Sequence, residues 1–158
     1  GSIVGAYWLF MLFGRLLGGL IGSKVSSKTM MITVSALGLM FIAAAMVTPL
    51  SATVKFPFVE AQVPISVIFF ILCGWCTSIM WGGIFNLAVE GLGKYTAAAS
   101  GIFMVMVCGG GIIPLIQGWF SDHFGYMNSY WVMFACLAYL LFYGLIGSKN
   151  VNKDIPVA

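Results

Sequence analysis

Two side chains in one apolar stretch are suited to binding a polyhydroxylated solute. Trp81 carries an indole that can stack on the C–H face of a pyranose ring, and the Asn86 carboxamide both donates and accepts hydrogen bonds. Gln117 offers the same amide chemistry in a later apolar stretch, and Tyr7 offers a phenol in the first. We take these four residues as the candidate substrate-binding set. For each one taken singly, a packing or lipid-facing role is the more common one, and Tyr7 is also typical of an interfacial aromatic belt.

Arg15 and Glu90 are ionisable groups placed inside apolar stretches, where charge is costly and often functional. Arg15 lies nine residues before Lys24, about 13 Å along a helix, and Glu90 lies four residues before Lys94, about 6 Å. An arginine side chain can extend toward the interface over most of that offset. We therefore expect an Arg15–Glu90 ion pair that ties two helices together. The alternative is that each charge reaches water or headgroups separately.

The sequence contains no residue set that is typical of catalysis, a metal or a cofactor. Cys73 and Cys76 match a CxxC pattern in letters, but they lie inside an apolar stretch, and Cys108 and Cys136 are isolated on other stretches. We interpret all four as small apolar core residues. His123 lacks a nucleophile or metal partner and is expected to be a solvated loop residue. The sequence favours a protein that is not an enzyme and binds no metal or cofactor.

The composition requires a lipid environment. Of 158 residues, 61% are apolar, 15% aromatic and 7% charged, against roughly 25% charged in an average soluble domain. So few charges cannot cover a water-soluble globule, and lipid must solvate much of the surface. Soluble enzymes, disordered tails and secreted disulfide scaffolds are excluded. The net charge of +3 is too small and scattered for a nucleic-acid partner.

Five apolar stretches are long enough to cross a bilayer as helices. The hydrocarbon core is about 30 Å thick and takes about 20 residues of helix. Barrel strands would alternate apolar and polar residues, which these stretches do not, and backbone groups in lipid must bond within their own segment. The expected fold is an all-α membrane protein with five transmembrane helices, at about residues 3–22, 30–50, 64–91, 97–120 and 129–147.

Lysines in the loops predict the orientation. The loops after the first and third helices and the C-terminal tail share one side, which carries five lysines against one on the other. Because cytoplasmic loops are rich in Lys and Arg, we expect the C-terminus in the cytoplasm and the N-terminus outside. No signal peptide is visible before the first helix. An exterior N-terminus is natural if an odd number of helices precedes it, so we expect a fragment whose partners include missing N-terminal helices.

Small residues mark where helices should approach one another. Gly14, Gly18 and Gly22 repeat at four-residue spacing in the first helix and predict a close helix contact. The third helix carries a small and polar face that either packs on a neighbour or lines an aqueous cavity. The members of this α-helical stripe are Gly74, Ser78, Gly82, Asn86 and Glu90.

Two glycine clusters are expected near the membrane midplane, roughly 17–21 Å from the inner end of their helices. They are Gly82 and Gly83 in the third helix, and Gly109, Gly110 and Gly111 in the fourth. Pro114 adds a predicted kink or unwound turn. Broken helices of transporters hold substrate at this depth. Close helix packing alone explains the glycines equally well.

Several longer motifs point to one family. These are SIMWGGIFNLAVEGLGKYT at residues 78–96, GGGIIPLIQG at 109–118, G-x-x-x-D-x-x-G at 118–125, and Tyr7-Trp8 followed by Gly14-Arg15-x-x-Gly18. In this order they resemble the tenth helix with its loop, the eleventh helix, the loop after it, and the eighth helix of major facilitator superfamily sugar permeases. The most similar group is the fucose–proton symporter type, which includes glucose/galactose permeases. The resemblance covers nearly the whole chain.

The resemblance implies that the five helices are helices eight to twelve of a twelve-helix transporter. It also implies two six-helix halves that rock around a central site, and sugar uptake with a coupling cation such as a proton, in a bacterial inner membrane. The acidic groups implied in proton coupling belong to the absent half. Trp81-Gly82-Gly83 stands where the group usually has Phe-Pro-Thr. The alternative function is a non-transporting membrane subunit or assembly factor that packs through its glycine ridges.

Overall fold

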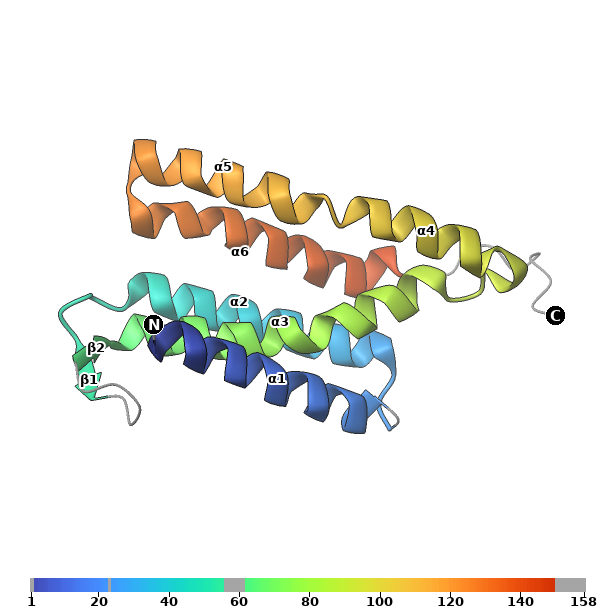
Figure 1. Ribbon diagram of the computed structural model, residues 1–158, viewed down its shortest axis with the longest axis horizontal. Helices are drawn as coiled ribbons and strands as arrows, with labels where there is room; N and C mark the ends of the chain where they lie inside the picture. The colour runs from blue at the N-terminus through green and yellow to red at the C-terminus, as the bar shows by residue number, and fades with distance from the viewer. Residues whose placement is uncertain (1, 23, 56–61, 150–158) are drawn as a thin grey trace.

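The computed structural model describes residues 2–22, 24–55 and 62–149, which form an elongated bundle of helices (Figure 1). The helices are α1 (Ser2–Gly22), α2 (Ser27–Val47), α3 (Ile65–Val89), α4 (Thr96–Met106), α5 (Gly109–Phe124) and α6 (Tyr126–Phe142). A short 3-10 turn, η1 (Gly93–Tyr95), precedes α4, and a π-helical turn, η2 (Tyr143–Gly147), continues α6.

Within the described residues, five helical segments are long and apolar enough to cross a membrane: Ile3–Gly22, Ser27–Val47, Ile65–Val89, Gly93–Phe124 and Tyr126–Gly147. The expectation of a helical protein with five such helices is therefore confirmed. The helices run alternately between the two ends of the bundle (Figure 1). The α1–α2 and α3–α4 connections and the end of η2 lie together at one end, which we call the lysine-rich end for Lys24, Lys28, Lys94 and Lys149.

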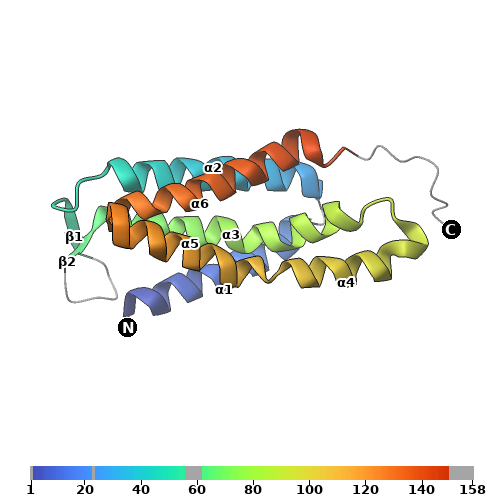
Figure 2. The ribbon, with the colours of Figure 1, turned by 90° about the horizontal axis from the view of Figure 1, so that it is seen from above.

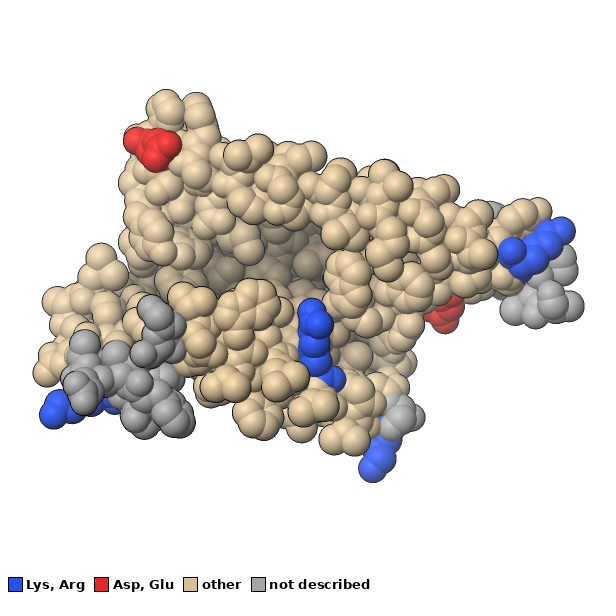
Figure 3. Space-filling model, in the orientation of Figure 1, with Lys and Arg blue, Asp and Glu red and all other residues tan. Residues whose placement is uncertain are grey.

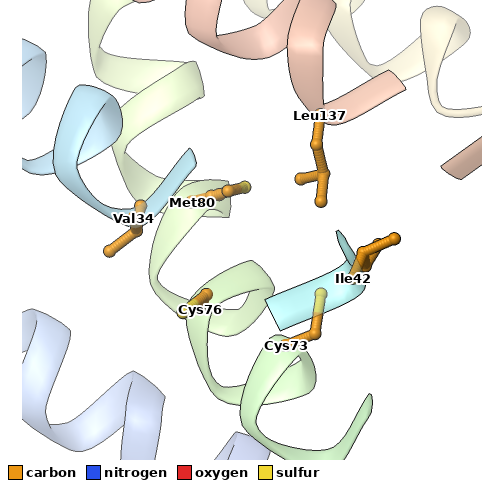
Figure 4. Packing of buried hydrophobic residues seen from close by; sticks show 6 residues of the cluster. All are labelled: Val34, Ile42, Cys73, Cys76, Met80 and Leu137. Atoms are coloured by element: carbon orange, nitrogen blue, oxygen red, sulfur yellow. The ribbon is translucent and has the colours of Figure 1, made fainter. Parts of the chain in front are cut away.

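The helices form two layers. In one layer α3 packs on both α2 and α1, and in the other α5 packs on α6 (Figures 1 and 2). Helix α6 joins the layers through its contact with α2. The main core cluster lies between α2, α3 and α6 and contains Val34, Ile42, Cys73, Cys76, Met80 and Leu137 (Figure 4). Cys73 and Cys76 are thus small core residues, as predicted. The same prediction is wrong for Cys108, which is exposed between α4 and α5, and Cys136 on α6 is half-buried.

The predicted bounds of the second helix are displaced by three residues at each end. Helix α2 begins at Ser27 because the Ser26 hydroxyl caps it, accepting a hydrogen bond from the Thr29 amide at 3.2 Å. It ends at Val47 because Thr48 precedes Pro49 and adopts extended backbone, with φ −72° and ψ 123°. The hydrophobic pattern alone does not report either signal.

A short hairpin connects α2 to α3 and was not predicted. Strands β1 (Thr53–Lys55) and β2 (Gln62–Pro64) pair antiparallel, with Val54 opposite Val63. Three-residue strands are too short to show a clear alternation of apolar and polar residues. Pro64 ends β2 and caps α3, so it lies just before the first turn of that helix rather than inside it.

The fourth predicted span is divided in two. Helix α4 ends at Met106 and α5 begins at Gly109, with a tight turn at Val107 and Cys108 whose carbonyls accept from Gly110 and Gly111 at 2.9 Å. The interruption comes just before the three glycines, and Pro114 lies inside α5. Helix α5 continues to Phe124, four residues beyond the predicted end.

The longer α5 corrects the placement of His123, which lies in the last helical turn and not in a loop. Its ring stacks on Trp119 with 4.4 Å between centroids, and Nδ1 lies 2.8 Å from the Trp119 carbonyl oxygen. Gly125 alone connects α5 to α6, with φ 89° and ψ 157°, a conformation essentially reserved for glycine. The sharp reversal brings the two helices side by side (Figure 1).

Candidate functional site

A polar hollow opens on the face where α1, α3 and the start of α2 meet. Its volume is about 420 Å³. On the face shown in Figure 3 the molecule is also hollowed between its two layers of helices. We call it the central hollow. It is lined by Arg15, Gly18, Gly19, Gly22, Ser27, Met30, Ser78, Ile79, Trp81, Gly82 and Asn86.

The small and polar stripe on α3 has two different environments along its length. Toward the hairpin end it packs on α1: the Tyr7 ring lies directly over Gly74, and the Ser78 hydroxyl donates to the Met11 carbonyl oxygen at 2.6 Å. Toward the lysine-rich end, Gly82 and Asn86 are exposed and line the central hollow. Both interpretations of the stripe therefore apply, each to one half of it.

The glycine ridge of α1 is occupied by α3 of the same chain. A Cβ on Gly14 would lie 2.7 Å from Trp75 Cδ1 and 2.9 Å from the Trp75 carbonyl oxygen. At Gly18 the corresponding contact is Ile79, at 3.4 Å. The helices diverge beyond this point, since a Cβ on Gly22 would meet no described atom within 4 Å. Close packing at Gly14 thus gives way to the central hollow at Gly18.

Trp81 lies at the wall of the central hollow that faces α4. Its ring and that of Phe85 both contact Phe103 edge-to-face, with centroid separations of 5.7 and 5.4 Å. Trp81 keeps 45% of its surface exposed, so much of the indole is available to a ligand. The aromatic contacts also fix the indole, which reduces the rotamer entropy lost on binding.

Asn86 lies beside the first residue of α2. Its Nδ2 donates to Ser27 Oγ across 3.4 Å, which is longer than the usual 2.7–3.2 Å. Asn86 is exposed and Ser27 half-buried. Sequence reasoning does not single out Ser27, because a serine at the start of a helix is ordinarily explained by capping. Its functional relevance comes from its position opposite Asn86.

A second hollow, of about 670 Å³, lies at the lysine-rich end and is called the end vestibule here. It is lined by Ser26, Ser27, Lys28, Asn86, Leu87, Glu90, Ser148 and Lys149. Arg15 lines the central hollow and Glu90 lines the vestibule. Within the described residues no ion pair joins Arg15 to Glu90. The expected pair is not formed here, because the two groups lie at different depths along the bundle.

The other candidate residues lie away from the central hollow. Tyr7 lines a separate cavity of about 190 Å³ between α1, α2, α3 and α6. Gln117 is half-buried on α5 and is not part of the central hollow's lining. Of the predicted midplane glycines, Gly82 lines this hollow and Gly83 packs against Ser27 and Met31, whereas a Cβ on Gly109, Gly110 or Gly111 would meet no described atom within 4 Å. The structure brings together Trp81, Asn86 and Arg15, but not Tyr7 or Gln117.

Comparison with known proteins points to sugar transporters. The chain is 47% identical over 77 residues to a glucose/galactose transporter of Brucella abortus biovar 1 (strain 9-941), covering 49% of this chain and 19% of that protein. It is 28% identical over 153 residues to a Helicobacter pylori (strain ATCC 700392 / 26695) protein whose description also names a glucose/galactose transporter, covering 94% of this chain and 34% of that protein.

The chain therefore spans between about a fifth and a third of the length of these relatives. No family model and no solved structure matches it. One of the two alignments extends over nearly the whole chain, as the resemblance drawn from the sequence motifs does. The resemblance of this chain to sugar permeases of the glucose/galactose type is confirmed by these relatives.

Proposed function

We propose that the chain forms part of a secondary transporter that imports a hexose by alternating access, coupled to a cation such as a proton. The observation that carries the proposal is the central hollow, in which polar groups and an exposed indole meet among apolar helices. Ligand pockets commonly have volumes of about 300–1,000 Å³, and the central hollow, at about 420 Å³, is within that range. The names of the relatives support glucose or galactose as the substrate class.

The lining of the hollow matches the chemistry of a hexose. Trp81 can stack on the apolar face of the ring, and the Asn86 amide can donate to one hydroxyl and accept from another. Arg15 adds several donors without an acceptor, and these suit ring or hydroxyl oxygens. Because the hollow is open on one side, the remaining contacts must come from elsewhere in the complete protein.

The wider arrangement follows from this proposal. The five helices correspond to helices eight to twelve of a twelve-helix major facilitator fold, and the N-terminal helices of the same transporter cover the open side of the hollow. The groups that bind the coupling ion lie among those helices. The lysine-rich end faces the cytoplasm of a bacterial inner membrane, in line with the excess of positive charge on cytoplasmic loops. Lipid surrounds the apolar outer faces.

A subunit that only packs through glycine ridges fits the structure less well. Gly14 and Gly18 contact α3 of the same chain, so this part of the ridge is not available to a foreign helix. Packing alone also gives no reason for a polar hollow beside an exposed tryptophan. Transport accounts for both features.

Uptake of labelled glucose and galactose by cells expressing the complete protein tests the proposal. Trp81→Ala and Asn86→Ala should each abolish most uptake while the amount of protein in the membrane is unchanged. Trp119→Ala and Asn128→Ala are matched controls, since both residues are exposed and lie outside the central hollow. If uptake survives both hollow substitutions, the assigned residues do not bind the sugar. If no uptake is seen with the unaltered protein, the proposed function is wrong.

A further inference from the structure

An apolar crevice lies between α1 and α2 toward the lysine-rich end of the bundle. Both helices pack on α3 but make few contacts with each other, and a space of about 300 Å³ remains between them, with α3 as its floor. We call this space the apolar crevice. Its walls include Ile21, Val25, Thr33 and Leu37, and its floor includes Trp75 and Cys76.

The lining of the crevice suits a hydrocarbon and not water. The Thr33 hydroxyl already donates to the Thr29 carbonyl oxygen at 2.9 Å. A buried water needs two to four polar partners, and the aliphatic side chains that dominate the lining supply none. Ile21 and Val25 are 43% and 36% exposed, so the crevice opens at the surface. Because this part of the chain is apolar enough to cross a membrane, the solvent at that surface is lipid.

The crevice is wide enough for one acyl chain but not for a helix. On α2 its lining runs from Met30 to Leu37, about 10 Å at 1.5 Å per residue. Its volume of about 300 Å³ spread over that length gives a mean cross-section of about 30 Å². A helix with its side chains is about 10–12 Å across and needs about 80–110 Å². A helix from a second copy or from the rest of the protein therefore cannot enter the crevice.

A positive charge lies at the mouth of the crevice. Lys24 lies between Ile21 and Val25, which both line the crevice, in a turn where the amides of Lys24 and Val25 donate to the Ile21 carbonyl oxygen at 2.9 and 3.0 Å. Within the described part of the chain Lys24 is exposed and forms no ion pair, and the two acidic residues described there, Glu90 and Asp122, do not line the crevice. Each lysine near a membrane surface favours an anionic lipid by about fivefold.

We propose that the apolar crevice binds one anionic phospholipid, with an acyl chain between α1 and α2 and the phosphate at Lys24. The depth fits this arrangement, because Leu37 lies about 15 Å beyond Ser27, the first residue of α2, and one leaflet of the hydrocarbon core is about 15 Å thick. The site shares Met30 and Ile79 with the central hollow but none of its charged or amide residues. It goes beyond the proposed function and does not depend on it.

Quenching of tryptophan fluorescence by phospholipids with brominated acyl chains tests the site in the complete protein in neutral detergent. Trp75 is a built-in reporter, because its side chain lines the crevice. Brominated phosphatidylglycerol should quench one part of the fluorescence in a saturable manner. Trp75→Phe should remove this saturable part, and Trp119→Phe, which removes an exposed indole on α5 outside the crevice, should leave it.

The headgroup is tested by removing one charge at a time. Lys24→Gln should raise the half-saturating mole fraction of phosphatidylglycerol by about fivefold, to the value found with the zwitterionic phosphatidylcholine. Lys94→Gln is the matched control, since it removes the same charge from the same end of the bundle outside the crevice and should leave the value unchanged.

The acyl chain is tested by filling the crevice while Trp75 stays in place. Thr33→Phe adds bulk to the wall and should abolish the saturable quenching. Ala36→Phe adds similar bulk to an exposed position of the same helix outside the crevice and should not. This pair also answers the question if Trp75→Phe does not fold.

Three results would overturn the site. Saturable quenching that survives both Trp75→Phe and Thr33→Phe would place the lipid elsewhere. Complete absence of saturable quenching would show that the crevice holds no lipid, as when a side chain from the rest of the protein or from a second copy fills it. Equal effects of Lys24→Gln and Lys94→Gln would reduce the headgroup preference to general surface charge. None of these readouts requires sugar uptake, so the lipid site and the proposed function can fail separately.

Discussion

The contact between α1 and α3 leaves no room for a side chain at Gly14. A Cβ there would lie 2.9 Å from the Trp75 carbonyl oxygen, and a helix backbone atom cannot move aside alone. Gly14→Ala must therefore push α1 away from α3 and strain the 2.6 Å bond from Ser78 to Met11. Overpacking costs about 1–3 kcal/mol, and a hydrogen bond between membrane helices is worth about 0.6 kcal/mol. We expect a destabilisation of roughly 2 kcal/mol.

Thermal unfolding in detergent, followed with a thiol-reactive fluorogenic maleimide, measures this effect. Cys73 and Cys76 are 7% and 1% exposed and report core opening once the exposed Cys108 and the half-buried Cys136 are changed to alanine. At about 2–4 °C per kcal/mol for a domain of this size, the apparent midpoint should fall by about 4–8 °C.

Gly5→Ala is the matched control on the same helix, because a Cβ on Gly5 would meet no described atom within 4 Å. Its midpoint should be unchanged or slightly higher, since alanine favours helix more than glycine does. Equal midpoints for Gly14→Ala and Gly5→Ala would refute the close contact between α1 and α3. Helix α1 would then not define the closed end of the central hollow.

Two further substitutions test other parts of the structure. Gly125→Ala should strain the backbone by about 1–3 kcal/mol and so lower the unfolding midpoint, because alanine is disfavoured at φ 89° and ψ 157°. Gly118→Ala is the control in α5, because its Cβ would meet no described atom within 4 Å, and it should leave the midpoint unchanged. Equal midpoints for the two variants would contradict the turn geometry. Phe103→Ala removes ring contacts with Trp81 and Phe85 worth about 0.5–1.5 kcal/mol each, so hydrogen exchange should quicken in α4 and not in α5. Unchanged exchange in α4 would show that these rings do not hold it.

The helical plan could be predicted from sequence because it depends on composition and length. Apolar stretches of about 20 residues have few alternatives to helix in lipid, and the five helices follow from that. Their bounds depend on local chemistry. The Ser26 cap sets the start of α2, and α5 extends over Asp122 and His123 because polar residues are acceptable in the last turn of a helix.

The candidate site could be predicted only in part. Periodicity identified the face of α3 that carries Asn86, but not the point at which α1 diverges from it. That divergence separates a packed half of the face from an open half, and it depends on the three-dimensional course of two helices. Tyr7 was placed with the site because of its type, whereas the structure packs it over Gly74.

Ser27 shows the limit of reading one helix at a time. It lies 59 residues from Asn86 in sequence, and their contact arises only when the start of α2 is packed beside the end of α3. The predicted Arg15–Glu90 ion pair is not formed among the described residues, although sequence reasoning places both charges toward the same end of the bundle. The Arg15 side chain lines the central hollow and the Glu90 side chain lines the end vestibule.

Protection of Gly82→Cys by sugar tests the central claim most directly, namely that the central hollow holds the solute. In the complete protein, D-glucose or D-galactose should slow the reaction of this cysteine with a charged thiol reagent, and the enantiomer L-glucose should not. Labelling of Lys94→Cys should be unaffected by either sugar. Equal rates at Gly82→Cys with and without D-glucose and D-galactose, in a protein that transports them, would show that the solute binds elsewhere.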